Sequence, residues 1–249
     1  MRVVRVFQDE DVRYGLADES SITLISDEPF AAWEAEGVVP LAQAQLLAPV
    51  MPTKIVCVGI NYRDHASEMG HAVPAEPVIF LKPPTAVVGP RGEIQVPEKL
   101  ETVDHEAELA VVIGRRTRRV SPESARSHVL GFTCANDVTS REIQRIDGQW
   151  TRAKGFDTFC PVGPWIETDL DPSDLVIESY VNGELRQQAQ TSEMIYDVFE
   201  LVSFISGVMT LLPGDLVLTG TPSGVGPLHR GDVVEVRIEG IGSLVNRVV

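Results

Sequence analysis

The sequence predicts a mainly β protein with few helices, in which a small N-terminal β domain over residues 1–52 precedes a larger domain over residues 53–249. Two observations predict this fold class. Short apolar runs of strand length are separated by charged and glycine-rich turns, and the chain lacks the repeated strand–helix–strand order of a doubly wound nucleotide-binding fold. The domain boundary follows from Pro52, after which the turn-rich first segment gives way to a strongly apolar strand pattern.

The strands follow one another along most of the chain. In the N-terminal domain, β-like runs are expected over residues 1–8 and 12–26. Buried strands are then expected over residues 54–61, 77–83, 107–114 and 127–137. A hairpin is predicted over residues 175–190, because Asn182-Gly183 is a strong two-residue turn signal between paired strands. One helix is predicted over residues 194–212, followed by a strand, a glycine-rich loop and two more strands.

The charge balance limits the partners that the chain can bind. The 249 residues include 21 Lys and Arg against 36 Asp and Glu, which gives a formal net charge of −15 at pH 7. This charge repels phosphate backbones and anionic membranes, so neither a nucleic-acid nor a membrane partner is expected. An anionic substrate would need a local positive group, either a metal ion or clustered Lys and Arg. Three scattered cysteines and the lack of a signal or membrane-spanning pattern favour a cytoplasmic protein.

Two acidic residues stand at the start of the apolar run over residues 105–114. On a strand Glu106 and Glu108 share a face, where two carboxylates about 7 Å apart repel each other unless a cation lies between them. One interpretation is an exposed edge strand with two solvated acids. The other adds Asp137, which ends the next apolar strand and could lie beside the pair. Three carboxylates without Cys or His ligands would form a hard-oxygen site suited to Mg²⁺ or Mn²⁺.

A possible base lies within residues 61–70. If this segment is helical, His65 and Glu68 share a face at positions i and i+3. A carboxylate beside an imidazole orients the ring and raises its basicity, which is the pairing used in general bases. The alternative is a surface helix with an ordinary contact between neighbouring turns.

Three cations and one loop complete the set of candidates. Lys82, Arg141 and Lys154 follow apolar stretches or lie beside a candidate ligand in the sequence, and they gain meaning only if the metal site exists. The loop over residues 219–226 fits neither glycine-rich phosphate-binding pattern. It could still present backbone N–H groups and the Thr221 hydroxyl to a carboxylate, or it could be a plain turn.

Taken together and in this order, these segments resemble the fumarylacetoacetate hydrolase family. The resemblance covers about three quarters of the chain, essentially all of residues 54–242, and its strength comes from the order and density of the matches. The matching segments are KIVCVGINYRDHASEMG, EPVIFLKPPTAVVG, DHEAELAVVIG, GFTCANDVTSRE, KGFDTFCPVGPW, the Asn-Gly hairpin and PGDLVLTGTPSGVGPLHRGDVVEVRIEGIG. The first 50 residues are similar to the short, variable N-terminal domain of bacterial members.

The resemblance implies a fold and a set of site residues. The fold is a mixed β-roll of the fumarylacetoacetate hydrolase C-terminal type, assembled as a homodimer. One Mg²⁺ or Mn²⁺ per subunit would be held by Glu106, Glu108 and Asp137, with no organic cofactor. A lid would carry the His65/Glu68 pair, and Lys154 would lie near the metal as a catalytic residue. The residues expected to contact the substrate are Lys82, Arg141, Gln144 and Thr221.

The family acts on 2-oxo and 2,4-dioxo acids. The resemblance therefore implies a metal-dependent enzyme that hydrolyses a C–C bond of acylpyruvates or decarboxylates oxaloacetate, and the intact His65/Glu68 pair favours C–C cleavage. The alternatives are a 2-hydroxyhepta-2,4-diene-1,7-dioate isomerase of aromatic catabolism and a catalytically silent dimer that binds an oxo acid. A small anionic 2-oxo acid could chelate the metal, which would overcome the repulsion from the acidic chain.

Overall fold

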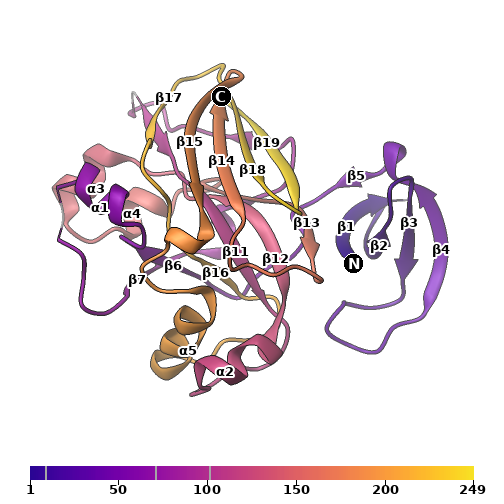
Figure 1. Cartoon of the computed structure of the whole chain (residues 1–249). Helices are drawn as coiled ribbons and strands as arrows, with labels where there is room; N and C mark the ends of the chain where they lie inside the picture. Colours follow the sequence, from indigo (N-terminus) through magenta and orange to yellow (C-terminus); the bar gives the residue numbers. More distant parts are fainter. Residues whose placement is uncertain (9, 71, 101) are drawn as a thin grey trace.

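The chain folds mainly as β structure. The computed structural model describes residues 1–8, 10–70, 72–100 and 102–249 (Figure 1). In this part of the chain three sheets account for the strands, and five α-helices and four short 3₁₀ turns lie between them. The mainly β fold with few helices is therefore confirmed.

The largest sheet contains twelve strands and forms the centre of the molecule. In sheet order its strands are β4 (Ala35–Pro40), β3 (Ser21–Ile25), β2 (Asp11–Ala17), β1 (Arg2–Gln8), β13 (Cys160–Glu167), β12 (Val129–Asn136), β11 (Ala107–Ile113), β16 (Leu216–Leu218), β6 (Ile55–Gly59) and β7 (Val78–Lys82). Two short strands lie off this path, β5 (Gln45–Leu46) beside β1 and β8 (Val87–Val88) beside β13.

Two smaller sheets and the helices pack around it. The second sheet has the order β15 (Glu184–Gln190), β14 (Val176–Val181), β18 (Val233–Ile238), β19 (Gly242–Val248) and β9 (Glu93–Ile94), and the third pairs β10 (Val103–His105) with β17 (Gly226–Leu228). The helices are α1 (Arg63–Glu68), α2 (Pro122–Ala125), α3 (Arg141–Asp147), α4 (Thr151–Lys154) and α5 (Val198–Val208). The 3₁₀ turns span Leu41–Gln43, Pro84–Ala86, Arg126–His128 and Thr191–Glu193. Figure 1 shows α1, α3 and α4 gathered on one side of the molecule, while α2 and α5 lie together below the sheets.

The N-terminal strands form a separate group at one end of the molecule (Figure 1). Strands β1 to β4 pair antiparallel in sequence order and enclose a small apolar core that includes Val4, Val6 and Ile22. The group joins the main sheet where Arg2 and Val3 of β1 pair with β13. The small N-terminal β unit thus continues the large sheet through the pairing of two residues of β1 with β13.

The strand that begins between the two glutamates lies in the middle of the molecule. All seven residues of β11 are buried, with β12 on one side and β16 on the other. Leu109 and Val111 face the core shared with α5, whereas Ala110 and Val112 face the opposite core. The interpretation of this segment as an exposed edge strand is therefore wrong, because both faces of the sheet are covered.

Two expected elements differ in detail from the structure. The strand over residues 77–83 is β7, which lies at the edge of the sheet and leaves Val78 and Leu81 exposed instead of buried. The helix expected from residue 194 begins after Asp197, whose carboxylate accepts hydrogen bonds from the N–H groups of Phe199 and Glu200. The predicted hairpin is present, and Asn182 and Gly183 both adopt positive φ, as a tight turn of this kind requires.

The directions of the central strands bring four chain segments to one edge of the sheet. Strand β12 ends beside the start of β11, since Asn136 pairs with Ala107 in the antiparallel register. Strands β6 and β16 run parallel to each other and antiparallel to β11, so both end at the same edge. The residues that follow β6, β12 and β16 therefore surround the residues that open β11. In the described part of the chain, no helix has the length and apolar character needed to cross a membrane.

Candidate active site

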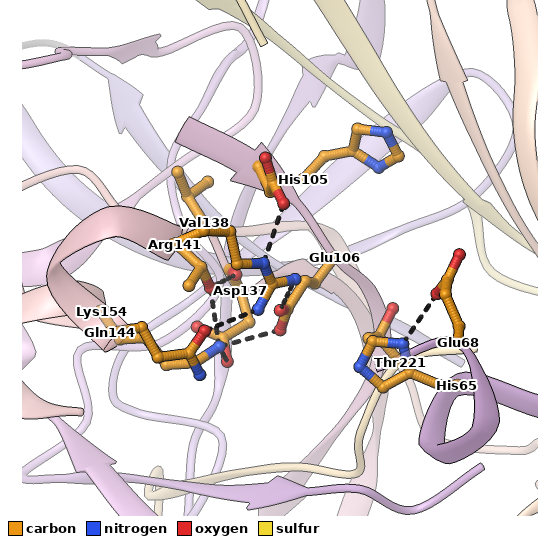
Figure 2. Close-up of polar contacts among 12 residues, drawn as sticks. His65, Glu68, His105, Glu106, Asp137, Val138, Arg141, Gln144, Lys154 and Thr221 are labelled. Atoms are coloured by element: carbon orange, nitrogen blue, oxygen red, sulfur yellow. Dashed lines mark hydrogen bonds and ion pairs between the residues drawn. The ribbon is translucent and has the colours of Figure 1, made fainter. Parts of the chain in front are cut away.

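Three carboxylates converge where β11 begins and β12 ends. Glu106 precedes β11, Glu108 is its second residue, and Asp137 follows β12, with its backbone N–H donating to the Glu106 carbonyl at 2.9 Å. One oxygen from each of the three carboxylates lies within 4.8 Å of the other two, and all three side chains are buried. The sequence-based grouping of Asp137 with the two glutamates is thus present as a compact cluster. Figure 2 shows Glu106 and Asp137 of this cluster.

Lys154, the last residue of α4, holds two members of this cluster. Its ammonium group donates to Glu106 Oε2 at 2.9 Å, to Asp137 Oδ2 at 2.7 Å and to Thr139 Oγ1 at 2.7 Å. An ammonium has three N–H bonds, so all of its donors are used. Lys154 lies beside the cluster and its hydrogen bonds position the carboxylates, while its catalytic role stays a prediction.

Lys82 lies on the other side of Asp137. Its side chain leaves the end of β7 and is fully buried, and the ammonium contacts Asp137 Oδ1 at 2.5 Å and the Val138 carbonyl at 3.2 Å. The sequence analysis expected Lys82 to contact the substrate. The structure places it against Asp137, so that each oxygen of this carboxylate faces one lysine.

Arg141 and Gln144 extend from α3 toward the same cluster. The Arg141 guanidinium donates to Asp104 Oδ2 at 2.8 Å and to Gln144 Oε1 at 3.0 Å, and it forms an ion pair of 2.5 Å with Glu106 Oε1. Both Arg141 and Gln144 line the cavity above the carboxylates. The expectation that they contact the substrate stays a prediction, and the structure adds that Arg141 orients Glu106.

The surroundings shift the pKa values of the cluster in opposite directions. Burial raises the pKa of Glu106, but the charges of Arg141 and Lys154 outweigh it and hold this pKa well below its usual range. Burial, and then repulsion from Asp137 and Glu106, raise the pKa of Glu108 well above its usual range. Burial lowers the pKa of Lys154, but Asp137 and Glu106 reverse this effect and raise it overall. The cluster thus contains one carboxyl group whose ionisation calls for additional positive charge.

The His65/Glu68 pair lies at the rim of the cavity on α1. The helix is present, and Glu68 Oε2 lies 3.1 Å from His65 Nδ1, so the predicted geometry of the pair is found. Glu68 Oε1 accepts a hydrogen bond of 3.0 Å from the Gly224 N–H, which fixes the carboxylate from its other side. Among the described residues nothing is bonded to Nε2, and Figure 2 shows this nitrogen on the side of the ring away from Glu68. His65 is buried and lines the cavity, whereas Glu68 is exposed, and the role of the pair as a general base stays a prediction.

The glycine-rich loop after β16 connects several parts of the site. The Gly220 N–H donates to Glu108 Oε2 at 2.7 Å, and the buried Thr221 lines the cavity next to His65 (Figure 2). Gly220 has a φ of +95°, and a Cβ there would lie 2.7 Å from the Cβ of Asn61. The loop does present an N–H group to a carboxylate, but this carboxylate belongs to the protein.

Apolar side chains close the cavity on the side of α3 and β7. The cavity has a volume of about 40 Å³, and Phe80, Trp150 and Met69 contribute to its walls. Trp150 packs edge-on to Phe80 at 5.2 Å between ring centroids and lies so close to Gly59 that a Cβ there would be 2.6 Å from the indole. The cavity is therefore small, with charged side chains of both signs at its floor and aromatic side chains along one wall.

Sequence reasoning missed several polar residues that hold this arrangement. His105, Gln187 and Asn61 are buried and hydrogen-bonded around the loop and the start of β11. Asp104 was also missed, although it accepts a hydrogen bond from Arg141. The spacing of the sequence gives no signal for Asn61 or Gln187. His105 stands directly before the two glutamates, and this position could have drawn attention to it.

The residues present fit a divalent cation. The three carboxylates offer oxygen ligands only, which is the donor set that Mg²⁺ and Mn²⁺ prefer. With Asp104 counted, the site contains four acidic side chains. Lys82, Lys154 and Arg141 supply three positive charges, so one negative charge remains unbalanced. Glu108 is the acid that lacks a cationic partner among the described residues, and a cation would supply one.

Comparison with known proteins identifies the family. The model of the fumarylacetoacetate hydrolase C-terminal domain matches residues 54–249, and a model of the N-terminal domain of Rv2993c-like proteins matches residues 1–49. The chain belongs to the fumarylacetoacetate hydrolase family. The resemblance inferred from the sequence is thereby confirmed.

Relatives within the family carry different activities. A crystal structure of a 2-hydroxyhepta-2,4-diene-1,7-dioate isomerase from Mycobacterium marinum is 50% identical with a TM-score of 0.93, covering 100% of this chain and 98% of that one. The mitochondrial oxaloacetate tautomerase FAHD2B of Bos taurus is 46% identical over 225 residues, which are 85% of this chain and 72% of the relative. A maleylpyruvate hydrolase from Sphingobium sp. SYK-6, solved with manganese(II) and pyruvate, is 31% identical with a TM-score of 0.84, covering 100% and 99% of the two chains. These family members are enzymes.

Proposed function

We propose that this chain is a divalent-metal-dependent enzyme that moves a proton at the carbon next to the keto group of a small 2-oxo acid, as in keto–enol tautomerisation. The observation that carries the proposal is the His65/Glu68 pair, whose imidazole lines the same small cavity as the three-carboxylate cluster. The isomerase and the tautomerase, at 50% and 46% identity, support this reaction class over the hydrolysis and decarboxylation favoured by the sequence analysis.

The charges of the site suit a small anion. A divalent cation on Glu106, Glu108 and Asp137 would turn the local charge from one excess negative to one excess positive. The net charge of the chain is −15, so its surface repels anions. The local positive charge would therefore favour binding of an anion at this site. The small cavity favours an acid of few carbon atoms over a bulky one.

The residues of the chain have separate tasks in the proposed reaction. The bound cation would polarise the keto oxygen and so acidify the neighbouring C–H bond. His65 accepts the proton at Nε2, while Glu68 accepts the hydrogen bond from Nδ1–H and stabilises the positive charge that the ring gains. Lys154 and Arg141 keep Glu106 in place, and Lys82 and Lys154 keep Asp137 in place. Return of the proton from His65 to the oxygen or to another carbon completes the tautomerisation or isomerisation.

Hydrolysis of a C–C bond is the second candidate. The same His65 could take a proton from water instead of from carbon, and the 31% identical maleylpyruvate hydrolase supports this possibility. Decarboxylation of oxaloacetate needs only the electron sink and no base. The residues of the site are compatible with all three reactions, so an assay must distinguish them.

A panel assay on the purified, EDTA-treated chain tests the proposal. Oxaloacetate in D₂O is followed by ¹H NMR after addition of Mg²⁺ or Mn²⁺, with the metal alone as the control for spontaneous exchange. Accelerated exchange at C3 without pyruvate supports proton transfer. Pyruvate from oxaloacetate indicates decarboxylation, and pyruvate from an acylpyruvate indicates hydrolysis. Binding of oxalate with no turnover of any substrate would contradict an enzymatic role and leave a silent oxo-acid-binding protein.

A further inference from the structure

Gln187 is a buried amide between the carboxylate cluster and the glycine-rich loop. It lies in β15 and is 1% exposed, whereas its neighbours Arg186 and Gln188 are exposed. Its Oε1 accepts hydrogen bonds from the Ala107 N–H at 3.0 Å and from His105 Nδ1 at 3.1 Å. Its Nε2 donates to Thr221 Oγ1 at 2.7 Å and to the Pro222 carbonyl at 2.8 Å. The amide therefore uses its full hydrogen-bonding capacity.

Two backbone partners determine which way this amide points. The Ala107 N–H can only donate and the Pro222 carbonyl can only accept, so Oε1 must face Ala107 and Nε2 must face Pro222. As a result the amide also donates to the Thr221 hydroxyl, which has to act as the acceptor. The hydrogen of that hydroxyl remains available, and no described residue accepts it. Since Thr221 lines the cavity, this hydrogen is available to an acceptor oxygen there.

The same amide touches the strand that carries the carboxylates. Ala107 lies between Glu106 and Glu108, so the bond to its N–H anchors the backbone of both candidate ligands. The Gly220 N–H, one residue before Thr221, donates to Glu108. One side chain thus connects the candidate metal ligands with the loop that holds the candidate substrate contact.

We propose that Gln187 is a positioning residue, whose amide directs the Thr221 hydroxyl toward the bound oxo acid and fixes the loop of residues 219–226 against the start of β11. This inference rests on the proposed function, because it requires an oxo acid in the cavity. It assigns a task in the reaction to the hairpin of β14 and β15, which contributes no residue to the cavity wall.

Exchange of this amide for a carboxylate is the sharpest test. Gln187→Glu keeps the size of the side chain but places an acceptor oxygen against the Pro222 carbonyl and draws the Thr221 hydrogen away from the cavity. We expect the dissociation constant of oxalate, measured by calorimetry with Mn²⁺ present, to rise about tenfold, the scale of one lost hydrogen bond. KM should rise by a similar factor, with a smaller change in kcat. Gln188→Glu makes the same chemical change on an exposed neighbour and should leave both constants unchanged.

A double-mutant cycle distinguishes positioning from a general loss of structure. If Gln187 acts through Thr221, then Gln187→Glu should weaken oxalate binding no further in a Thr221→Val background. Additive losses would overturn the proposal, as would normal oxalate binding by Gln187→Glu. Should this variant not fold, Gln187→Met, which removes the amide without adding a charge, should show the same loss and the same cycle. Failure of the wild-type chain to bind oxalate with Mn²⁺ would instead contradict the proposed function itself.

Discussion

Lys82 and Lys154 approach Asp137 from two sides, and this arrangement explains how three carboxylates remain buried together. Each lysine is itself buried and contacts one oxygen of Asp137. An unpaired buried charge costs far more than a paired one, so the lysines permit the cluster to form before any cation binds. Among the described residues Glu108 has no such lysine partner, and burial together with repulsion from Asp137 and Glu106 raises its pKa.

The position of Lys82 leads to a prediction about stability. Lys82→Met removes a charge that faces Asp137, and we expect a loss of about 3–5 kcal/mol in the free energy of unfolding of the metal-free protein. Urea denaturation in the presence of EDTA measures this free energy of unfolding. Lys99→Met, at an exposed lysine, is the control and should change little. If Lys82 contacts substrate instead, the variant would keep its stability and show a raised KM.

The ring nitrogen Nε2 of His65, which no described residue bonds, leads to a prediction about rate. His65→Ala should lower kcat for the substrate identified in the panel assay by roughly 10²–10⁴-fold, the usual contribution of a general base. Manganese affinity should be unchanged, because the ring bonds to Glu68 and to none of the three carboxylates. Calorimetry with Mn²⁺ and steady-state kinetics measure the two effects. An equal loss of metal binding would make His65 a ligand.

At the scale of elements, the loop over residues 219–226 is clamped between β15 and α1. Gly224 has a φ of +93°, and a Cβ there would lie 2.2 Å from the Arg186 carbonyl oxygen. Its N–H also holds Glu68 Oε1. The loop therefore cannot move at this position without moving the carboxylate that orients His65.

Gly224→Ala tests this clamp. The clash with β15 should displace the loop and break the hydrogen bond from the Gly224 N–H to Glu68, the carboxylate that orients His65. We expect kcat to fall by at least tenfold, the scale of one lost hydrogen bond. Gly231→Ala is a matched control, because it has a similar φ of +96° but open space around its Cβ. Both variants carry the backbone strain of a positive φ, so only the clash distinguishes them. Equal kinetics for the two variants would contradict a role for the clamp.

The turn between β2 and β3 carries a pH-dependent contribution to stability. The backbone N–H groups of Ser20 and Ser21 donate to Asp18 and lower the pKa of this carboxyl to about 2. A lowered folded-state pKa stabilises the fold above the unfolded value, and the contribution disappears as the pH falls through about 2. NMR titration of Asp18 should give this pKa. The stability difference between wild type and Asp18→Asn should shrink over the same acid range, and an unchanged difference would argue against it.

The elements also show what the sequence could and could not predict. The hairpin at Asn182-Gly183, β6, β11 and β12 were predictable because their turn residues and apolar runs are local signals. The depth of β11 was not, since its burial depends on the sheet and helix that cover it from far away in the sequence. Gln187 was missed for the same reason. In the run of polar residues from Arg186 to Gln188 only the fold shows which side chain turns inward.

For the whole molecule, a bound cation should add to stability as well as to activity. A ligand that binds only the folded state stabilises it by about 2.7 kcal/mol at a hundred times its dissociation constant. Mn²⁺ or Mg²⁺ added to EDTA-treated protein should therefore raise Tm and restore turnover. Asp137→Asn should remove both responses. Full activity of metal-free protein would contradict the cation site.

The meeting of several strand ends at one sheet edge has an evolutionary consequence. The candidate base follows β6, the candidate ligands lie at the start of β11 and after β12, and the candidate hydroxyl follows β16. The segments that follow β6 and β16 can accumulate substitutions or insertions while the strands beneath them keep their pairing and their apolar faces. New specificities can therefore arise by changing one segment at a time, with the three-carboxylate cluster inherited intact. A site built in this way suits a family whose members include an isomerase, a tautomerase and a hydrolase.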